Sequence, residues 1–200
     1  MITLDKYLEA SAAQHSHLCP RQVLGIRAAL VATDLLELDT PCPDKRLLVI
    51  SETDGCFTDG VRVVTGVSVG HRTLRIEDYG KIAATFIDVK QGRAIRVAPR
   101  AGVREQARNY RPEEKRRYFS QLHAYQIMPA EALFKIQEVR LTTPLRAIIS
   151  RAGVRTECDQ CGEEIINERE IRRDGLTLCH SCAGKAYYVA INELKPTKQD

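Results

Sequence analysis

The histidines and cysteines of this chain fall into two groups whose spacing is typical of metal ligands. In the first group, His15, His17 and Cys19 occupy alternate positions and Pro20 follows at once. We expect an extended segment to deliver the three side chains to the start of a helix, because proline is favoured at the first helical position. The free amides of a helix N-terminus favour a thiolate, which makes Cys19 a candidate metal ligand or catalytic nucleophile. The alternative is that these side chains are simply packed or exposed at a helix start.

Cys56 is the candidate partner of this group. Four consecutive apolar residues bounded by turn residues predict a buried strand over residues 45–51. Cys56 would then emerge at the carboxyl end of that strand, where side chains from separate elements converge. Cys42 lies in a proline-rich link, and we expect it to take no part.

A single metal ion is the chemistry that these residues suggest. Two ligands two residues apart on an extended segment can share an ion only if a third donor arrives from elsewhere. We therefore expect His17, Cys19 and Cys56 to bind one ion with at least one coordination position open, and His15 to be a fourth ligand or a supporting group. Mixed imidazole and thiolate ligation favours zinc, with nickel, cobalt or iron as alternatives, and an open position permits Lewis-acid chemistry.

The second group consists of two Cys-x-x-Cys pairs, Cys158/Cys161 and Cys179/Cys182, with seventeen residues between them. Each tight turn presents two thiolates, and the four complete a tetrahedral zinc site. Neither pair is followed by histidine, which excludes haem attachment, and the βαβ context of a thioredoxin-like redox pair is absent. Four protein ligands leave no open position, so this module is predicted to serve folding and docking and not catalysis.

Length and composition bound the class of protein. Two hundred residues, 44% of them apolar and 28% charged, fit one substantial core with a small appended module. The longest apolar runs are far shorter than a membrane-spanning helix needs, and no signal peptide is apparent. Paired cysteines suit metal binding in a reducing compartment. We therefore expect a cytoplasmic protein. The net charge of +4 is compatible with nucleic acid or phosphate ligands but too small to argue for either.

The remaining elements follow from periodicity. We predict a short helix over residues 1–13, a second helix from Pro20 to about Leu38, and a third beginning near Thr58. Alternation predicts strands between residues 72 and 98, with a hairpin at residues 90–92.

The segment that follows is charged and predicted to be helical. Pro112 would begin one helix, and the basic residues between 100 and 117 could meet phosphate, although the interleaved glutamates favour an ordinary solvated face. A strand over residues 134–141 is expected to carry a bulge at 137–138, and residues 142–155 are expected to be a linker.

Several motifs, taken in order, resemble one known family. They are His15-x-His17-x-Cys19-Pro20, Leu24-Gly25-x-Arg27-x-Ala29, Cys56-x-x-Asp59, Thr65-Gly66, Asp78-Tyr79-Gly80-Lys81-x-Ala83-x-Thr85-Phe86 and the four-cysteine tail. Over essentially its whole length the chain resembles the family named after the E subunit of formylmethanofuran dehydrogenase. The resemblance implies an α+β fold, a helix-flanked mixed or antiparallel sheet over residues 1–150, followed at residues 151–200 by a zinc ribbon of the DksA/TraR type.

The resemblance also implies site residues. The metal ligands of the family would map to His17, Cys19 and Cys56, with His15 adjacent. Members often carry a cysteine directly after Thr-Gly, where this chain has Val67, and His71 is the candidate substitute. We expect Lys81 to act near this site with its amine available to an anionic or carbonyl ligand; the alternative is a solvated turn lysine.

The function implied is that of a zinc-binding accessory protein related to C1 metabolism, whose His/Cys site is either catalytic in its own right or handles metal. A molybdenum or tungsten enzyme is the partner that the resemblance suggests, and we also expect a homodimer. The sequence contains no pterin-binding or iron–sulfur pattern of its own. The alternative function is a nucleic-acid-binding regulator that uses the zinc ribbon and the basic segment.

Overall fold

The computed structural model describes residues 3–15, 17–192 and 194. The chain divides into two compact units, Met1–Leu145 and Arg146–Asp200. None of the described helices combines the length and the apolar composition that a membrane-spanning helix requires.

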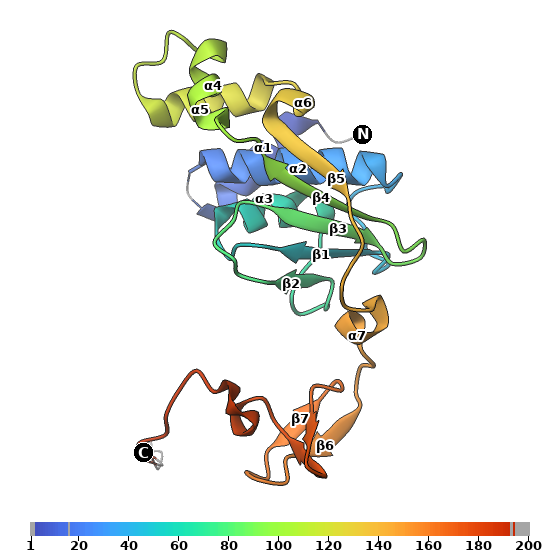
Figure 1. Cartoon of the computed structure of the whole chain (residues 1–200). Coiled ribbons are helices and arrows are strands. Elements are labelled where there is room, and N and C mark those ends of the chain that lie inside the picture. Colours follow the sequence, from blue (N-terminus) through green and yellow to red (C-terminus); the bar gives the residue numbers. More distant parts are fainter. Residues whose placement is uncertain (1–2, 16, 193, 195–200) are drawn as a thin grey trace, which may run out of the picture. The chain divides into compact units, whose positions relative to one another are not determined.

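The first unit is built on a five-stranded mixed sheet with the strand order β2-β1-β3-β4-β5 (Figure 1). The strands are β1 Leu47–Ser51, β2 Leu74–Ile76, β3 Ala84–Asp88, β4 Ala94–Pro99 and β5 Phe134–Glu138. β1 and β2 are parallel, and the other three neighbouring pairs are antiparallel. The predicted α+β class with a mixed sheet is therefore confirmed, and the predicted hairpin joins β3 to β4.

Helices cover one face of this sheet (Figure 1). They include α1 Leu4–His15, α2 Pro20–Leu35 and α3 Cys56–Thr65. Their apolar side chains meet alternate strand residues, such as Val49, Phe86 and Val97, in one core. The connection from β4 to β5 is made by α4 Val103–Tyr110, α5 Arg117–Ile127 and α6 Ala130–Leu133.

Two glycines allow α2 and α3 to cross with their backbones in contact. A methyl group at Gly25 would overlap the carbonyl oxygen of Phe57, and one at Gly60 would overlap the carbonyl oxygen of Gln22. Only glycine permits such a close approach. The crossing lies within the first two turns of both helices, so it brings their N-terminal ends close together.

Arg27 fixes the end of α5 against α2. Its guanidinium donates to the carbonyl oxygens of Tyr125 and Gln126, both at 2.9 Å, and to that of Met128 at 2.8 Å. These carbonyls belong to the last turn of α5, where the helix itself supplies no donors. The side chains of α5 are thereby placed next to the N-terminal end of α2.

Four local predictions are wrong. α3 begins at Cys56 and not near Thr58, so this cysteine belongs to a first helical turn. His15 ends α1 instead of lying on an extended segment. The helix expected at Pro112 begins at Arg117, since residues 111–116 form turns and an extended N-cap. β4 and β5 pair in continuous register, so the expected bulge at residues 137–138 is absent and the strand simply ends at residue 138.

The second unit consists of two small hairpins and one irregular turn. Its elements are β6 Arg155–Glu157, β7 Glu164–Ile166, β8 Ile171–Arg173, β9 Leu176–Leu178 and the turn Ser181–Lys185. A short helix, α7 Leu145–Ile149, lies within the segment expected to be a linker. The buried apolar cluster of this unit contains only Cys158, Ile165, Leu178 and Ala183. So small a core is typical of modules that need a metal to fold.

Candidate functional site

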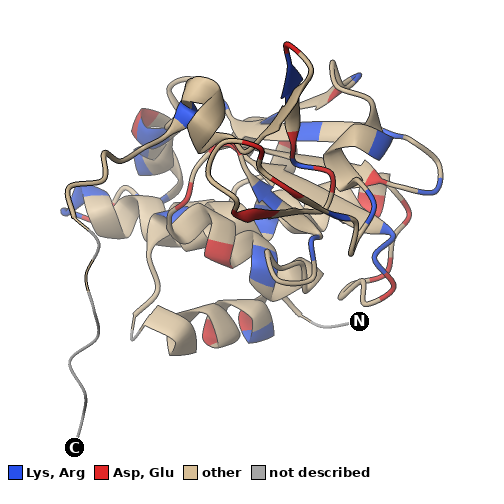
Figure 2. Cartoon of the chain, turned by 90° about the horizontal axis from the view of Figure 1, so that it is seen from below, with Lys and Arg blue, Asp and Glu red and all other residues tan. Residues whose placement is uncertain are grey.

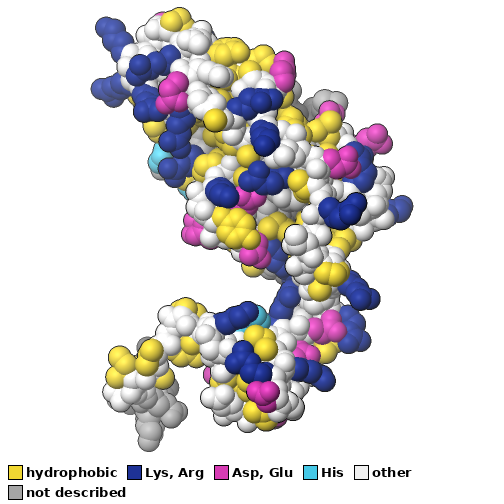
Figure 3. Space-filling view, in the orientation of Figure 1, with side chains coloured by type: hydrophobic (Ala, Val, Ile, Leu, Met, Phe, Trp, Pro, Cys, Tyr) yellow, Lys and Arg dark blue, Asp and Glu magenta, His cyan; other side chains and the backbone are white. Residues whose placement is uncertain are grey.

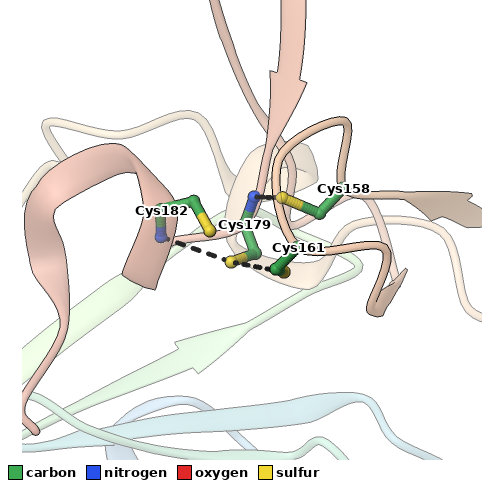
Figure 4. Close-up of side chains that lie close together, drawn as sticks. All are labelled: Cys158, Cys161, Cys179 and Cys182. Carbon is green, nitrogen blue, oxygen red and sulfur yellow. Dashed lines mark hydrogen bonds between the residues drawn. The ribbon is translucent and has the colours of Figure 1, made fainter. Parts of the chain in front are cut away.

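The four C-terminal cysteines form a cluster that is consistent with a structural zinc site. Their sulfur atoms all lie within 4.8 Å of one another, with 3.9 Å between Cys161 Sγ and Cys179 Sγ (Figure 4). In a tetrahedral site with Zn–S distances of about 2.3 Å, neighbouring sulfurs are about 3.8 Å apart. The donor set and its spacing therefore fit zinc, and the prediction that the four cysteines come together is confirmed.

Backbone amides prepare this cluster for a cation. The amide of Cys179 donates to Cys158 Sγ at 3.3 Å, and the amide of Cys182 donates to Cys179 Sγ at 3.4 Å (Figure 4). The amide of Cys179, followed by that of Cys161, lowers the pKa of Cys158 to about 6, whereas the neighbouring Cys179 thiol raises the pKa of Cys182 to about 12. Four adjacent thiolates repel one another unless a cation lies between them, and a divalent ion meets that requirement.

In the first unit, Cys19 is held rigidly as the N-cap residue of α2. Its backbone is extended, with φ −121° and ψ 158°, and its thiol accepts the amide of Gln22. The Gln22 side chain accepts the amide of Cys19 at 2.7 Å and donates to the carbonyl of Ser11 at 3.1 Å. This reciprocal cap fixes the thiol against both α1 and α2.

Cys56 lies beside Cys19, at the first residue of α3. Both thiols are half-buried, and they are close enough to interact. Burial raises the pKa of the Cys19 thiol, and Cys56 raises it further, while the amide of Gln22 opposes them. The expectation of a ready thiolate at this helix N-terminus is therefore wrong for the metal-free protein, because burial outweighs the amides. The close pairing of the two thiols depends on the glycine-mediated crossing of α2 and α3.

The thiols face a pocket of about 370 Å³ whose wall also includes the exposed side chain of His17. Among the described residues, only the four C-terminal cysteines bring three or more potential ligand atoms within 4.8 Å of one another. The structure thus gathers His17, Cys19 and Cys56 around one pocket without assembling them into a closed set of ligands.

His15 contacts a carboxylate at the start of α3. Its Nε2 lies 2.8 Å from Asp59 Oδ2, and Asp59 Oδ1 lies 3.3 Å from Arg62. Asp59 follows Cys56 by three residues, so the contact ties the end of α1 to the first turn of α3. His15 is not among the side chains that line the pocket, and this position suits support of the site better than direct ligation.

Lys81 lines a neighbouring pocket, also of about 370 Å³, together with Arg100 and Arg104. Its amine lies 5.9 Å from the centre of the Tyr79 ring. His71 is exposed in a turn and its amide donates to Ser68, and it lines neither pocket. The catalytic role predicted for Lys81 stays a prediction.

Most of the first unit matches one known protein family. A sequence model described as "FmdE, Molybdenum formylmethanofuran dehydrogenase operon" matches residues 14–139. The chain belongs to the FmdE family. The match covers His15, His17, Cys19, Cys56 and Lys81 and ends before the four-cysteine cluster.

One relative and one solved structure extend the comparison. The relative is an Archaeoglobus fulgidus protein named "Probable S-adenosyl-L-methionine-binding protein", 29% identical in an alignment of 207 residues that covers 93% of this chain and 55% of the relative. The chain thus spans about half the length of that relative. The structure is of a tungsten formylmethanofuran dehydrogenase FmdE-like protein from Syntrophus aciditrophicus, with a TM-score of 0.59 and 22% identity over 94% of this chain and 96% of the other. This likeness shows that the two proteins share a fold.

Sequence reasoning missed several residues that line the thiol pocket of this FmdE-family protein. Tyr118, Gln121 and Tyr125 come from α5, and Arg104 comes from α4. The three α5 residues recur at intervals of three and four, which places them on one face of the helix. That spacing could have revealed a shared face, but nothing in it indicates which other helix the face meets.

Proposed function

We propose that this FmdE-family protein binds one transition-metal ion, with zinc favoured, through Cys19, Cys56 and His17, and that the four-cysteine module holds a separate structural zinc. The observation that supports the first site is the pair of neighbouring thiols at the N-terminal ends of two helices in close contact, on the wall of a pocket that His17 also lines. Two sulfurs and one imidazole are a preferred donor set for zinc.

Each residue has a defined task in this proposal. Cys19 is fixed by its cap and Cys56 by the first turn of α3, so both thiols are in place before an ion arrives. His17 is exposed and completes the set by turning toward them. The contact between His15 and Asp59 keeps the end of α1 and the start of α3 together.

A metal with three protein ligands supplies Lewis-acid chemistry at its fourth position. The pocket leaves room for a small molecule beside the thiols, with the half-exposed Tyr118 on its wall. The Tyr118 hydroxyl donates to the carbonyl of Leu18 at 3.2 Å, so its ring is held over the entrance to α2. The site is therefore suited to binding or activating a small ligand in a setting partly shielded from water.

The metal content of the full-length protein tests this proposal. Protein purified without added metal, or loaded with zinc and desalted, is expected to hold two ions per chain. Cys56→Ser and Cys161→Ser are each expected to hold one. Cys42→Ser is the matched control, because Cys42 is a partly exposed cysteine whose thiol donates to the carbonyl of Asp39 at 2.8 Å, away from both sites. One ion in the wild-type protein, with none lost in Cys56→Ser, would contradict the proposal.

We further propose that the protein acts as an accessory protein of C1 metabolism and forms a homodimer. The description of its family, which refers to a molybdenum formylmethanofuran dehydrogenase operon, supports the first part. Light scattering of the purified protein tests the dimer, and co-purification with such an enzyme tests the association. A monomeric protein that captures no such enzyme would contradict both.

The nucleic-acid-binding alternative has less support. Figure 3 shows Lys and Arg side chains gathered over the part of the first unit that contains α4, but Figure 2 shows acidic positions interspersed among the basic ones along the chain. Arg117 is paired with Glu105 at 2.7 Å and Arg111 with Glu113 at 3.5 Å. We expect no retention on random DNA or RNA at low salt, and binding that weakens steeply with added salt would revive this function.

A further inference from the structure

The thiol pocket adjoins the pocket that Lys81 lines. The two pockets share the side chains of Leu24, Ile82, Arg104 and Tyr125, all of them in the first unit. Each has a volume of about 370 Å³. We call the two adjoining pockets the groove: Cys19 and Cys56 line one end and Lys81 lines the other, and each pocket has the size of a small-molecule site.

The walls of this groove are strongly biased toward positive charge. No Asp or Glu lines the thiol end among the residues that the structure describes, whereas Arg21 and Arg104 both do. At the other end, the one acidic residue, Glu105, is already paired with Arg117 at 2.7 Å.

The cations of the groove differ in whether they already have a partner. Arg96 is held by both carboxylate oxygens of Glu52, at 2.6 and 2.7 Å. Arg100 donates to the carbonyl of Glu131 at 2.6 Å. Within the described part of the chain, Lys81 and Arg104 have no carboxylate within 4.0 Å.

These cations are not needed to balance the proposed metal. Two thiolates and a neutral imidazole around a divalent ion give a site with no net charge. Arg104 and Lys81 therefore remain available for an anion that comes from outside the protein. A guanidinium presents paired donors that match a carboxylate or a phosphate, and an ammonium adds a point charge.

The side chains that both pockets share combine an apolar surface with the Arg104 guanidinium and the Tyr125 phenol. Leu24 and Ile82 supply the apolar surface. Tyr125 is 1% exposed, and burial raises the pKa of its phenol to about 12, so the hydroxyl keeps its proton and can act as a donor. A ligand that fits would have an anionic end, a short apolar body and a second end directed at the thiols.

We propose that the groove binds a small organic anion, a carboxylate or a phosphate monoester, whose charged group contacts Arg104 and Lys81 while its opposite end reaches Cys19 and Cys56. This inference rests on the proposed function, because it names the class of ligand that the metal site would serve. It also assigns Arg104 and Lys81 as binding residues for the charged group.

Calorimetric titration of the full-length, zinc-loaded protein tests the inference, with phenylacetate and phenyl phosphate as probes in a buffer free of phosphate. We expect one binding site per chain and at least a tenfold loss of affinity in Arg104→Gln and in Lys81→Gln, since each variant removes a charge-assisted contact. Arg108→Gln is the matched control, because Arg108 is exposed on the same helix and lines neither pocket. The neutral analogue phenylacetamide should bind at least tenfold more weakly, and the tighter of the two anions identifies the preferred charged group.

Anion affinities that are equal in the wild-type protein and in Arg104→Gln, with an unchanged melting temperature, would overturn the inference, and so would the absence of binding by both anions. Preference for S-adenosylmethionine over both anions would overturn it too, because that molecule carries a net positive charge. Zinc measured in the same samples separates the two proposals. Zinc bound through Cys56 without anion binding contradicts only the inference, whereas Arg104-dependent anion binding without that zinc contradicts only the metal site.

Discussion

Cysteines occur in three different settings in this chain, and the setting decides what each thiol can do. In the C-terminal cluster, backbone amides lower the pKa of Cys158, whereas the neighbouring Cys179 sulfur raises the pKa of Cys182. In the first unit, burial and the neighbouring Cys56 raise the pKa of the Cys19 thiol, which a metal would have to deprotonate on binding. Cys42 belongs to neither cysteine group: its thiol donates to the carbonyl of Asp39, and burial raises its pKa. The pKa of each thiol is therefore set by burial, by nearby backbone amides and by neighbouring sulfurs.

Replacing Cys161 with serine is expected to abolish structural zinc binding and to unfold the second unit. The buried cluster of that unit is too small to hold it together without the metal. Zinc content and limited proteolysis, followed by mass mapping of the cut sites, measure the two effects. Cys42→Ser is again the control. Full zinc content with unchanged protection from residue 155 onward would show that the four cysteines do not form a zinc site.

At the scale of the element, two helices and their glycines build the thiol pair. Cys19 and Cys56 are 37 positions apart in sequence, and they meet because α2 and α3 cross at Gly25 and Gly60. Alanine in a helix normally stabilises relative to glycine by about 0.5–1 kcal/mol. Here the added methyl groups would overlap backbone carbonyl oxygens that cannot move independently of their helix, so the steric cost outweighs the gain in propensity.

Gly25→Ala is accordingly expected to lower the free energy of unfolding by about 1–3 kcal/mol. It should also weaken metal binding at Cys19 and Cys56 while leaving the four-cysteine site loaded. Urea denaturation and zinc content per chain measure these effects. Gly70→Ala serves as the control, because a methyl group there would meet no atom within 4 Å, and its unfolding free energy should stay within about 0.5 kcal/mol of wild type. Equal stability of the two variants would mean that the helices do not touch at Gly25.

The ion pair between Asp88 and Arg46 makes the stability of the first unit depend on pH. Asp88 is fully buried at the end of β3, and its Oδ2 accepts from Arg46 at 2.7 Å. Arg46 first, and then the amides of Gln91 and Lys90, hold the pKa of Asp88 below its usual range. This pKa is lower in the folded than in the unfolded chain. The ionised Asp88 therefore stabilises the fold fully above about pH 4, and this stabilisation is lost as the pH falls through the pKa of the folded state.

Asp88→Asn should therefore lose about 2–3 kcal/mol of unfolding free energy at pH 7. The difference between the variant and the wild type should shrink as the pH falls below about 4, because the wild-type carboxylate then takes up a proton. Urea denaturation at a series of pH values measures that difference. A constant difference between pH 7 and pH 2 would show that the pair does not titrate in this way.

At the scale of the whole molecule, the sequence predicts what periodicity and local spacing encode. The apolar stripe after Pro20, the hairpin at residues 90–92 and the two Cys-x-x-Cys pairs each lie within a short window, and each is found where it was expected. The start of α3 and the positions of Arg104 and Tyr125 in the groove depend on how distant helices pack, which no local window contains. The contact of His15 with Asp59 was missed for the same reason, since it joins residues 44 positions apart.

Anomalous diffraction at the zinc absorption edge, from crystals of the full-length protein grown with zinc, tests the central claim most directly. We predict two peaks, one among the four C-terminal cysteines and a second within about 2.0–2.4 Å of the sulfurs of Cys19 and Cys56 and of a ring nitrogen of His17. A single peak at the four cysteines, with no ion between the thiols of Cys19 and Cys56 and with His17 turned to solvent, would contradict the account.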